Sequence, residues 1–343
     1  MKRLRRNLFS FSVGLFFGGV TLILFLFWWY LSSFLSASGL LFSELKSIIS
    51  IGYSQREQFQ NSRITFLILG LDQRSDAFES TLLTDTMILT SVDTRSHTIT
   101  MIPVPRDLWM NDLKTKVNAL YFYGEERDNT TGPEFTRQEL GRITGTTIEY
   151  YLVMNYNDLP ELIDLIGGID VDVAQSFTDN EYPNPDYLTG QTQPIYTSVQ
   201  FNKGLQHMDG KRALAYVRSR HSESEEGSDI SRSKRQTQVF QGIIAKLSDR
   251  SLIANPRQMG TVYRFWKESV KTDLSDSELI AVGLNLSPGD IDIRSASIPV
   301  GTADDPEAIL VNPPVSKYGL WVWEPKDPGW EKLREFISSS FRT

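Results

Sequence analysis

Residues 64–71 read ITFLILGL, an unbroken apolar run of the kind that forms a central strand buried on both faces of a sheet. Two more strands are predicted close behind it, at residues 85–93 (DTMILTSVD) and 98–104 (TITMIPV). Only residues 94–97 separate these two, which is a suitable length for a hairpin turn. The three segments therefore predict neighbouring strands that run up, down and up.

Helical and strand patterns alternate through the remaining chain. Strands are predicted at residues 148–155, 169–173 and 291–298, and helices at 158–166, 232–247, 258–270, 275–286 and 330–341. Asp209 is placed to cap a short helix through Ala215, and residues 216–220 are predicted to be extended or in a turn. Residues 174–202 are rich in Asn, Pro, Asp, Gly and Thr, which favours a long loop of the kind that often acts as a lid. This order predicts an α/β fold with a mixed central sheet.

The N-terminus carries the pattern of a membrane anchor. Residues 7–43 contain no charge, and residues 8–35 are dense in Leu, Ile, Val and Phe. About 20 apolar residues cross a hydrocarbon core, so this stretch is long enough to span a bilayer. Trp28, Trp29 and Tyr30 lie near its outer end, where such rings favour the membrane interface.

Four basic residues precede the apolar run: Lys2, Arg3, Arg5 and Arg6. The positive-inside rule then predicts a cytoplasmic N-terminus and an extracytoplasmic domain, as in a single-pass protein of a bacterial cell membrane. A cleaved signal peptide is the alternative, because Ser36-Ala37-Ser38 resembles a cleavage site. The apolar run is longer than the usual core of a signal peptide, which favours the uncleaved anchor.

The chain is expected to divide into five parts. They are a cytoplasmic basic tip (1–7), a transmembrane helix (8–35), a juxtamembrane linker (36–62), a globular domain (63–250) and a C-terminal extension packed on that domain (251–343).

Composition narrows the possible functions. The net charge is −7, and without the four basic residues of the tip it is about −11, because 31 basic residues face 42 acidic ones. A domain this acidic is a poor general binder of nucleic acid. The chain has no cysteine, which excludes disulfides, thiol catalysis and cysteine metal sites.

The three predicted strands bring polar residues to one edge of the sheet. With an up, down, up arrangement, Asp72, Asp85, Arg106 and Asp107 meet at the kind of edge where α/β folds bind ligands. Two carboxylates suit magnesium, which usually takes one or two of them together with phosphate oxygens. The alternative is that each aspartate only serves a turn or a helix cap.

A second group of basic residues stands out in the acidic domain. It consists of Arg212, Arg218, Arg220, His221, Arg232, Lys234 and Arg235. Arg218 and Arg220 would share one face of an extended segment, and Arg232 and Arg235 one face of a helix near its N-terminus. Arginine and helix N-termini both suit phosphate, so anion binding is predicted. The alternative is a solvated basic face balanced by the acidic residues Glu223, Glu225, Glu226 and Asp229.

Several ordered motifs together resemble the LytR-CpsA-Psr family, whose domain is also called the cell envelope-related transcriptional attenuator. The motifs are Gly70-Leu71-Asp72-Gln73-Arg74, Thr84-Asp85-Thr86-Met87, Pro105-Arg106-Asp107-Leu108, Ile166-Gly167-Gly168-Ile169-Asp170-Val171, Met208-Asp209-Gly210-Lys211-Arg212-Ala213-Leu214, Val217-Arg218-Ser219-Arg220-His221, and Asp229 to Arg232 with Arg235, Gln236 and Val239. The resemblance covers about residues 64–247 and the anchor.

The resemblance implies an extracytoplasmic α/β/α domain and a phosphotransferase. Such an enzyme moves a glycopolymer from a polyprenyl (pyro)phosphate carrier to peptidoglycan in cell-envelope assembly, and its activity could include hydrolysis of the polyprenyl pyrophosphate. The implied partners are the lipid-linked glycopolymer, peptidoglycan and the membrane, with no nucleic acid. The lipid tail is expected in an apolar tunnel between sheet and helices.

The resemblance also implies roles for single residues. Asp72 and Asp85 would hold magnesium or manganese, and with Arg106 and Asp107 they form the expected catalytic group. The expected phosphate ligands are Arg74, Arg106, Arg218, Arg220, Arg232 and Arg235, and the expected polar support comes from Asp229 and Gln236. The general base is left open among Asp72, Asp85 and Asp107.

One position departs from the family pattern. The family commonly has arginine two residues before the second aspartate, where this chain has Leu83. A phosphate ligand is therefore missing there or is supplied by another residue such as Arg74. This departure supports one alternative function, a non-catalytic binder of lipid-linked glycan. A second alternative, an envelope-related regulator, is disfavoured by the predicted external topology and the acidic charge of the domain.

Overall fold

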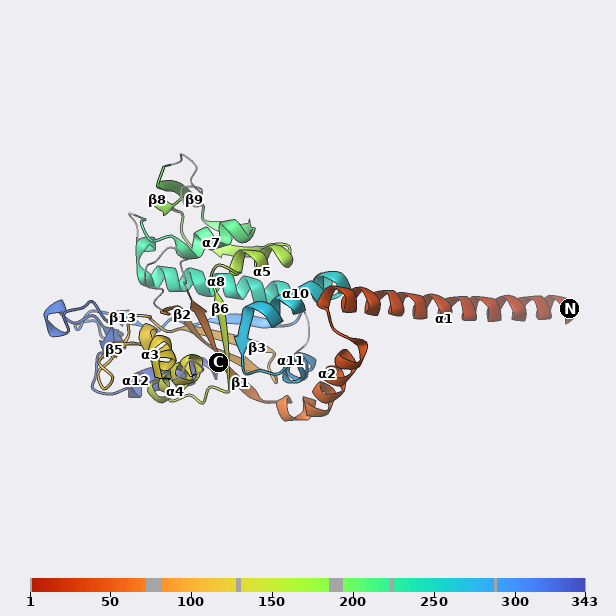
Figure 1. Cartoon of the computed structure of the whole chain (residues 1–343), viewed down its shortest axis with the longest axis horizontal. Helices are drawn as coiled ribbons and strands as arrows, with labels where there is room; N and C mark the ends of the chain where they lie inside the picture. The colour runs from red at the N-terminus through yellow and green to blue at the C-terminus, as the bar shows by residue number, and fades with distance from the viewer. Residues whose placement is uncertain are drawn as a thin grey trace.

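The structure is a computed structural model that describes residues 2–71, 82–127, 131–184, 194–222, 225–286 and 289–342. Helix α1 (Lys2–Ser38) projects from a domain made of all the other elements (Figure 1). Within α1, Gly14–Ser38 is long and apolar enough to cross a membrane. This helix is compatible with the predicted single-pass anchor.

The domain is built on a six-stranded mixed sheet with the strand order β11-β6-β1-β2-β3-β12. The strands are β1 (Arg63–Leu71), β2 (Thr84–Asp93), β3 (Thr98–Pro103), β6 (Tyr150–Asn155), β11 (Val270–Thr272) and β12 (Asp292–Ser295). β2 is antiparallel to both β1 and β3, whereas β6 is parallel to β1 and β12 is parallel to β3. The mixed sheet and the up, down, up order of β1, β2 and β3 are confirmed.

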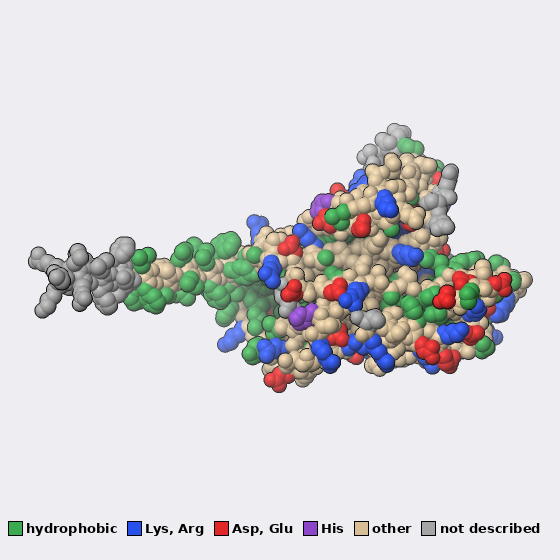
Figure 2. All heavy atoms as spheres, turned by 180° about the vertical axis from the view of Figure 1, so that it is seen from behind, with side chains coloured by type: hydrophobic (Ala, Val, Ile, Leu, Met, Phe, Trp, Pro, Cys, Tyr) green, Lys and Arg blue, Asp and Glu red, His purple; other side chains and the backbone are tan. Residues whose placement is uncertain are grey.

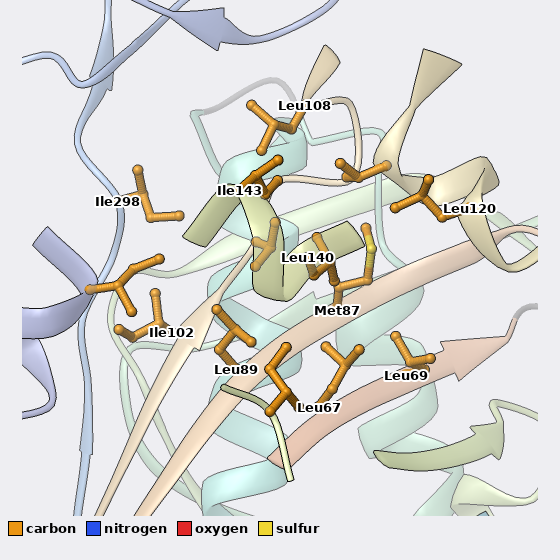
Figure 3. Close-up of a cluster of buried hydrophobic side chains, with 14 of the residues drawn as sticks. Leu67, Leu69, Met87, Leu89, Ile102, Leu108, Leu120, Leu140, Ile143 and Ile298 are labelled. Atoms are coloured by element: carbon orange, nitrogen blue, oxygen red, sulfur yellow. The ribbon is translucent and has the colours of Figure 1, made fainter. Parts of the chain in front are cut away.

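The apolar run of β1 is buried because helices cover both faces of the sheet. One face carries Leu67 and Leu69, which join a cluster with Leu140 and Ile143 of α4 (Figure 3). The other face carries Ile68, which joins a separate cluster. The covering helices are α3 (Leu120–Arg127), α4 (Gly132–Thr144) and α12 (Glu331–Ser340) on the first face, and α8 (Asp229–Leu247) and α11 (Asp276–Leu284) on the second. The expected α/β/α layering follows from this arrangement.

A second helical layer lies over α8. It contains α5 (Leu159–Leu165), α7 (Gly210–Arg218) and the antiparallel pair of β7 (Ile169–Val173) with β10 (Gly204–Met208). Gly167 and Gly168 follow α5 with φ of 84° and 83°, which only glycine adopts readily, so the predicted stop is confirmed. Asp209 caps α7 by accepting a hydrogen bond from the amide of Arg212 at 2.8 Å, again as predicted.

Two sequence predictions in this layer are wrong. Residues 174–202 were expected to form a long loop, but they contain β8 (Phe177–Pro183) and β9 (Tyr196–Phe201), which pair antiparallel. The hairpin is stabilised by Phe177 and Phe201, whose rings stack with centroids 5.1 Å apart. Residues 185–193 lie outside the described part of the chain.

The second wrong prediction concerns residues 216–220. Helix α7 continues to Arg218, so Arg218 and Arg220 do not share one extended face. Their i, i+2 spacing carries no information about a common side, because one residue ends a helix and the other follows it.

The C-terminal region is part of the domain rather than an appendage. It supplies both edge strands, β11 and β12, and also α10 (Pro256–Ser269), which lies beside α1. Three very short strands, β13 (Val300–Gly301), β14 (Leu310–Val311) and β15 (Glu324–Pro325), form a small sheet next to α12. Leu333 and Ile337 of α12 are fully buried in the main core.

The remaining elements are short or lie near the anchor. Helix α2 (Phe42–Gln55) packs on α11 in the region expected to be a linker. The others are η1 (Arg56–Phe59), β4 (Trp109–Met110), β5 (Thr115–Lys116), η2 (Val117–Ala119), η3 (Glu225–Gly227), α9 (Arg250–Ile253) and η4 (Val315–Lys317).

Candidate functional site

The ends of the central strands place charged side chains together, as the strand order predicts. Asp85 is the second residue of β2, and Arg106 comes shortly after β3. Nη1 of Arg106 donates to Oδ1 of Asp85 at 2.7 Å. The antiparallel pairing of β2 with β3 brings the start of one strand next to the end of the other, and this explains the contact.

Arg220 reaches the same carboxylate from the other layer of the molecule. Its Nη2 donates to Oδ2 of Asp85 at 2.9 Å. Burial alone would raise the pKa of Asp85, but Arg106, Arg232 and Arg220 together lower that pKa below its ordinary 3.8. Asp85 is therefore ionised at neutral pH and is surrounded by three guanidinium groups.

Arg232 carries a positive charge that the protein leaves only partly compensated. Its side chain lies in the first turn of α8, is 3% exposed and pairs with Oδ1 of Asp229 at 2.8 Å. Its Nε and Nη1 have no hydrogen-bond partner among the described residues. Burial, followed by the charges of Arg220 and Arg106, lowers the pKa of Arg232 to about 10. A buried cation with free N–H donors is costly without a partner and is well suited to an anion.

Asp107 lies beside this group and is almost fully buried. It accepts from Nε of Arg106 at 3.3 Å and from Nζ of Lys116 in β5 at 2.5 Å. Arg106 also pairs with Asp229 at 3.4 Å, so Asp229 bridges Arg106 and Arg232. Lys116 was missed by the sequence reasoning, because nothing marks a lysine in a predicted loop as a partner of Asp107.

Arg235 differs from the expectation that it binds phosphate. Its Nε donates to the carbonyl of Tyr216 at 2.9 Å, and its Nη2 donates to that of Ser219 at 2.6 Å. Its Nη1 bonds both the carbonyl and the carboxylate of Glu226, at 2.6 and 3.0 Å. The guanidinium also lies 4.9 Å from the ring centroid of Phe177. Because all three nitrogens are engaged, Arg235 holds the segment between α7 and α8 together instead of facing the site.

The other predicted residues have varied positions. Arg218 ends α7 and donates to Oδ1 of Asn157, the second residue beyond β6, at 3.1 Å. Gln236 is buried one residue beyond Arg235. Asp72 and Arg74 lie outside the described residues, so their predicted roles stay predictions.

Asp179 is a functional residue that the sequence reasoning did not find. It is fully buried in β8, and its Oδ2 accepts from the backbone amides of Arg220 at 2.9 Å and His221 at 3.2 Å. It therefore fixes the backbone that carries the Arg220 guanidinium to Asp85. An aspartate within a polar stretch gives no sign that it is buried, and no pattern in the sequence could have identified it.

Among the described residues, Asp85 could be one ligand of a cation, but a complete set of metal ligands is not present. Across the described ranges, no cluster of three or more His, Asp or Glu side chains is arranged to hold a metal. Asp85 is ionised and lies next to anion-binding arginines. Magnesium often binds through one or two carboxylates and completes its shell with water and phosphate oxygens, so binding of this ion by Asp85 stays a prediction.

A pocket with mixed walls adjoins the charged group. Arg106, Asp107 and Asp229 form its polar side, and the apolar wall includes Ile298 and Trp323. The backbone amide of Trp323 donates to the carbonyl of Asp107 at 2.9 Å. The C-terminal region therefore supplies one wall beside the candidate site.

Comparison with known proteins identifies the class to which this fold and site belong. The family model described as the LytR_cpsA_psr family matches residues 44–319, so the chain belongs to that family. The match extends beyond residue 250, in agreement with a C-terminal region that is integral to the domain.

Two relatives and one solved structure illustrate the likeness. A polyisoprenyl-teichoic acid–peptidoglycan teichoic acid transferase, TagU of Oceanobacillus iheyensis, is 27% identical over 223 residues, which are 64% of this chain and 62% of that protein. The regulatory protein MsrR of Staphylococcus aureus is 26% identical over 274 residues, 76% of this chain and 74% of that protein. The crystal structure of B. subtilis TagV matches with a TM-score of 0.58 at 23% identity, covering 82% of this chain and 98% of that one. The chain thus spans a little less than two-thirds of the TagU relative.

Proposed function

We propose that this protein is a phosphotransferase that moves a glycopolymer from a polyprenyl (pyro)phosphate carrier to peptidoglycan. The observation that carries the proposal is the buried Arg232 with its free N–H donors, next to Arg106, Arg220 and the ionised Asp85. The name of the TagU relative supports the choice of substrates. Membership of the family supports the reaction class.

The arginines perform most of the chemistry in this proposal. Arg232, Arg106 and Arg220 bind the non-bridging oxygens of the pyrophosphate and stabilise the charge that spreads over them in the transition state. A hydroxyl of a peptidoglycan sugar attacks the phosphorus that carries the glycopolymer, in line with the leaving oxygen. The bond from that phosphorus to the bridging oxygen breaks, and polyprenyl phosphate leaves.

The proton of the attacking hydroxyl goes to a carboxylate other than Asp85. Because its pKa is lowered and both of its oxygens accept from arginine, Asp85 is a weak base. It suits charge balance and cation binding better. Asp107 also has both oxygens engaged, by Arg106 and Lys116, so this criterion leaves Asp72 as the candidate for the general base.

Magnesium, or manganese, is part of the proposal. Asp85, together with Asp72, would hold the cation, and the ion would neutralise charge on the pyrophosphate. Asp229 pairs with both Arg106 and Arg232 and offsets the repulsion between their two positive charges.

The proposed location is the outer face of a bacterial cell membrane, with the N-terminus in the cytoplasm. The basic tip and the apolar α1 support this orientation. An anchored domain meets a membrane-borne donor at a high effective concentration. The acidic charge of the domain argues against nucleic acid as a partner.

The proposal is tested with the full chain in nanodiscs, given a polyprenyl diphosphate-linked sugar and a peptidoglycan acceptor. Release of polyprenyl phosphate is measured for the wild type, Arg232→Ala and Asp85→Ala. We expect losses of about 100- to 1,000-fold, the usual effect of removing one preorganised group that stabilises transition-state charge. Arg294→Ala, on the exposed edge strand β12, is the control and should keep full activity. Wild-type rates in both site variants would refute the proposal.

A non-catalytic binder is the second candidate, and Leu83 is the observation in its favour. Leu83 precedes β2 at the same sheet edge, where the family commonly has arginine. A binder would retain the lipid-linked donor on the nanodisc without releasing polyprenyl phosphate from it. In that case Leu83→Arg should create release, whereas in an enzyme that works without this ligand the substitution should change the rate little.

A further inference from the structure

Helix α2 exposes an unusual amount of apolar surface for a helix of a folded domain. Phe42 is 57% exposed and Ile49 is 47% exposed, and Leu41, Ile51 and Tyr53 are also exposed. Exposed apolar patches of this kind mark sites of interaction with a protein, a ligand or a membrane. Another part of α2 is in contact with the domain, because Gly52 packs closely against Ser277 and Ile280 of α11.

The outer end of α1 is docked on the domain rather than joined to it by a flexible linker. Tyr30 Oη donates to the carbonyl of Ile253 at 2.7 Å, and Arg264 Nη2 donates to that of Ser36 at 3.2 Å. Gly260 of α10 lies so close to α1 that a Cβ there would stand 2.6 Å from the carbonyl oxygen of Phe34. The domain therefore has a defined position relative to the membrane-spanning helix.

The length of α1 sets the height of this junction above the bilayer. α1 has 37 residues and extends for about 55 Å at 1.5 Å per residue. A hydrocarbon core of about 30 Å uses about 20 of these residues. With the basic tip on the inner side, the core ends near Trp28 and Trp29, the residues that favour an interface. The last turns of α1 then lie at the level of the outer headgroups.

An apolar cavity of about 570 Å³ lies at this level, between α1 and α2. Phe27, Tyr30, Leu31 and Phe34 of α1 line one side with helical spacing, and Phe42, Leu45 and Ile49 of α2 line the other in the same way. Figure 1 shows α2 beside the outer end of α1, and Figure 2 shows that the apolar cover of α1 continues to its junction with the domain. Lys46 is a charged residue on the rim, where its ammonium can reach a lipid phosphate while its stem stays on apolar surface.

We propose that α2 lies in the outer leaflet interface and that the cavity between α1 and α2 holds an acyl chain of an outer-leaflet phospholipid. The bilayer is the occupant because it already surrounds α1, whose face continues without a break into the cavity wall. Interfacial helices place their apolar face about 5–10 Å into the headgroup and acyl boundary, and α2 shares a cavity wall with Phe27–Phe34 at the outer end of α1. The contact fixes the tilt of the domain over the membrane. The inference rests on the insertion of α1 but not on the proposed chemistry.

The absence of cysteine makes a depth measurement straightforward. Single-cysteine variants of the full chain are labelled with an environment-sensitive fluorophore and reconstituted in phosphatidylglycerol-containing nanodiscs. Quenching by a nitroxide-labelled phospholipid is compared with quenching by aqueous iodide. The test variants are Phe42→Cys and Ile49→Cys. The controls are Leu22→Cys within α1, Ser47→Cys on the opposite face of α2, and Ser338→Cys on α12, far from the anchor.

We expect the labels at Phe42 and Ile49 to lose fluorescence with the lipid nitroxide and to resist iodide, like the label at Leu22. The labels at Ser47 and Ser338 should respond in the reverse way. Iodide quenching at Phe42 and Ile49 equal to that at Ser338, with Leu22 protected, overturns the inference and leaves the proposed function intact. Equal protection of Ser47 and Phe42 also overturns it, because no face of α2 would then be selected. Iodide access at Leu22 would refute the anchor itself.

Discussion

At the scale of single residues, Asp85 makes acid stability depend on an ion cluster. Its pKa is lowered in the folded state, so the stability it adds is present above the unfolded pKa of 3.8 and is lost as the pH falls through the lower folded value. We expect the free energy of unfolding of the wild type to decrease below pH 3.8 more steeply than that of Asp85→Asn. Urea titrations across this pH range measure the difference.

The exposed Asp304 provides a control for the Asp85 prediction. Asp304→Asn should leave the steepness of the acid transition unchanged. Parallel acid transitions for the wild type and Asp85→Asn would show that the arginines do not hold Asp85 in its ionised form.

Arg232 and Arg235 form a matched pair, one turn apart on α8. Arg235→Met leaves three carbonyl oxygens and Glu226 without their donor, so we expect a loss of about 3 kcal/mol of stability, from the cost of unsatisfied buried groups. Arg232→Met removes a buried charge with two free donors and should keep or raise stability, while transfer activity falls about 100- to 1,000-fold. Thermal unfolding and the polyprenyl phosphate assay, run on both variants, separate the two roles. Equal destabilisation by both substitutions would contradict this assignment.

At the scale of secondary-structure elements, the β8–β9 hairpin holds the segment that carries Arg220. Asp179→Asn keeps the shape of the side chain but removes its charge and one acceptor oxygen. We expect a loss of about 1–3 kcal/mol, because the backbone amides that donate to this buried carboxylate lose one of their two acceptor oxygens. Transfer activity should also decrease, since Arg220 would no longer be fixed against Asp85.

The matched control for Asp179 is Asn180→Asp, at the exposed neighbouring position of the same strand. It should change neither stability nor activity substantially. Activity that persists in Asp179→Asn after correction for the unfolded fraction would mean that β8 does not position Arg220.

At the scale of the whole molecule, we predict that the C-terminal region is required for folding. A chain that ends at residue 250 lacks both edge strands of the sheet and α12, whose Leu333 and Ile337 fill the main core. Loss of each such buried leucine or isoleucine costs about 2–5 kcal/mol, so the loss of two amounts to a large part of a typical folding free energy. We expect this truncated chain to lack a cooperative unfolding transition in circular dichroism. A chain that ends at Arg342 should unfold like the wild type, and cooperative unfolding of the short chain would contradict the prediction.

The sequence predicted the sheet well because its strongest patterns are local. The apolar run of β1 and the hairpin between β2 and β3 carry their own periodicity, so the convergence of Asp85 with Arg106 followed from strand direction alone. The β8–β9 hairpin was not predicted from the sequence, because its composition is polar and its few buried side chains are spaced irregularly. The strand predicted at residues 291–298 contains the edge strand β12, whereas the other edge strand, β11, has only three residues and carries too little pattern to be recognised.

The sequence by itself determined the long apolar helix at the N-terminus, the central strands, the family resemblance and the presence of an arginine-rich site. Only the tertiary structure decided which arginine does what. Arg232 and Arg235 have the same chemistry and lie on the same helix, but one is buried with free donors and the other is bonded to three carbonyl groups. The acceptors come from Tyr216, Ser219 and Glu226 on a segment that folds back against α8. A hydrogen bond depends on where distant backbone atoms arrive, and residue spacing within one helix does not encode that.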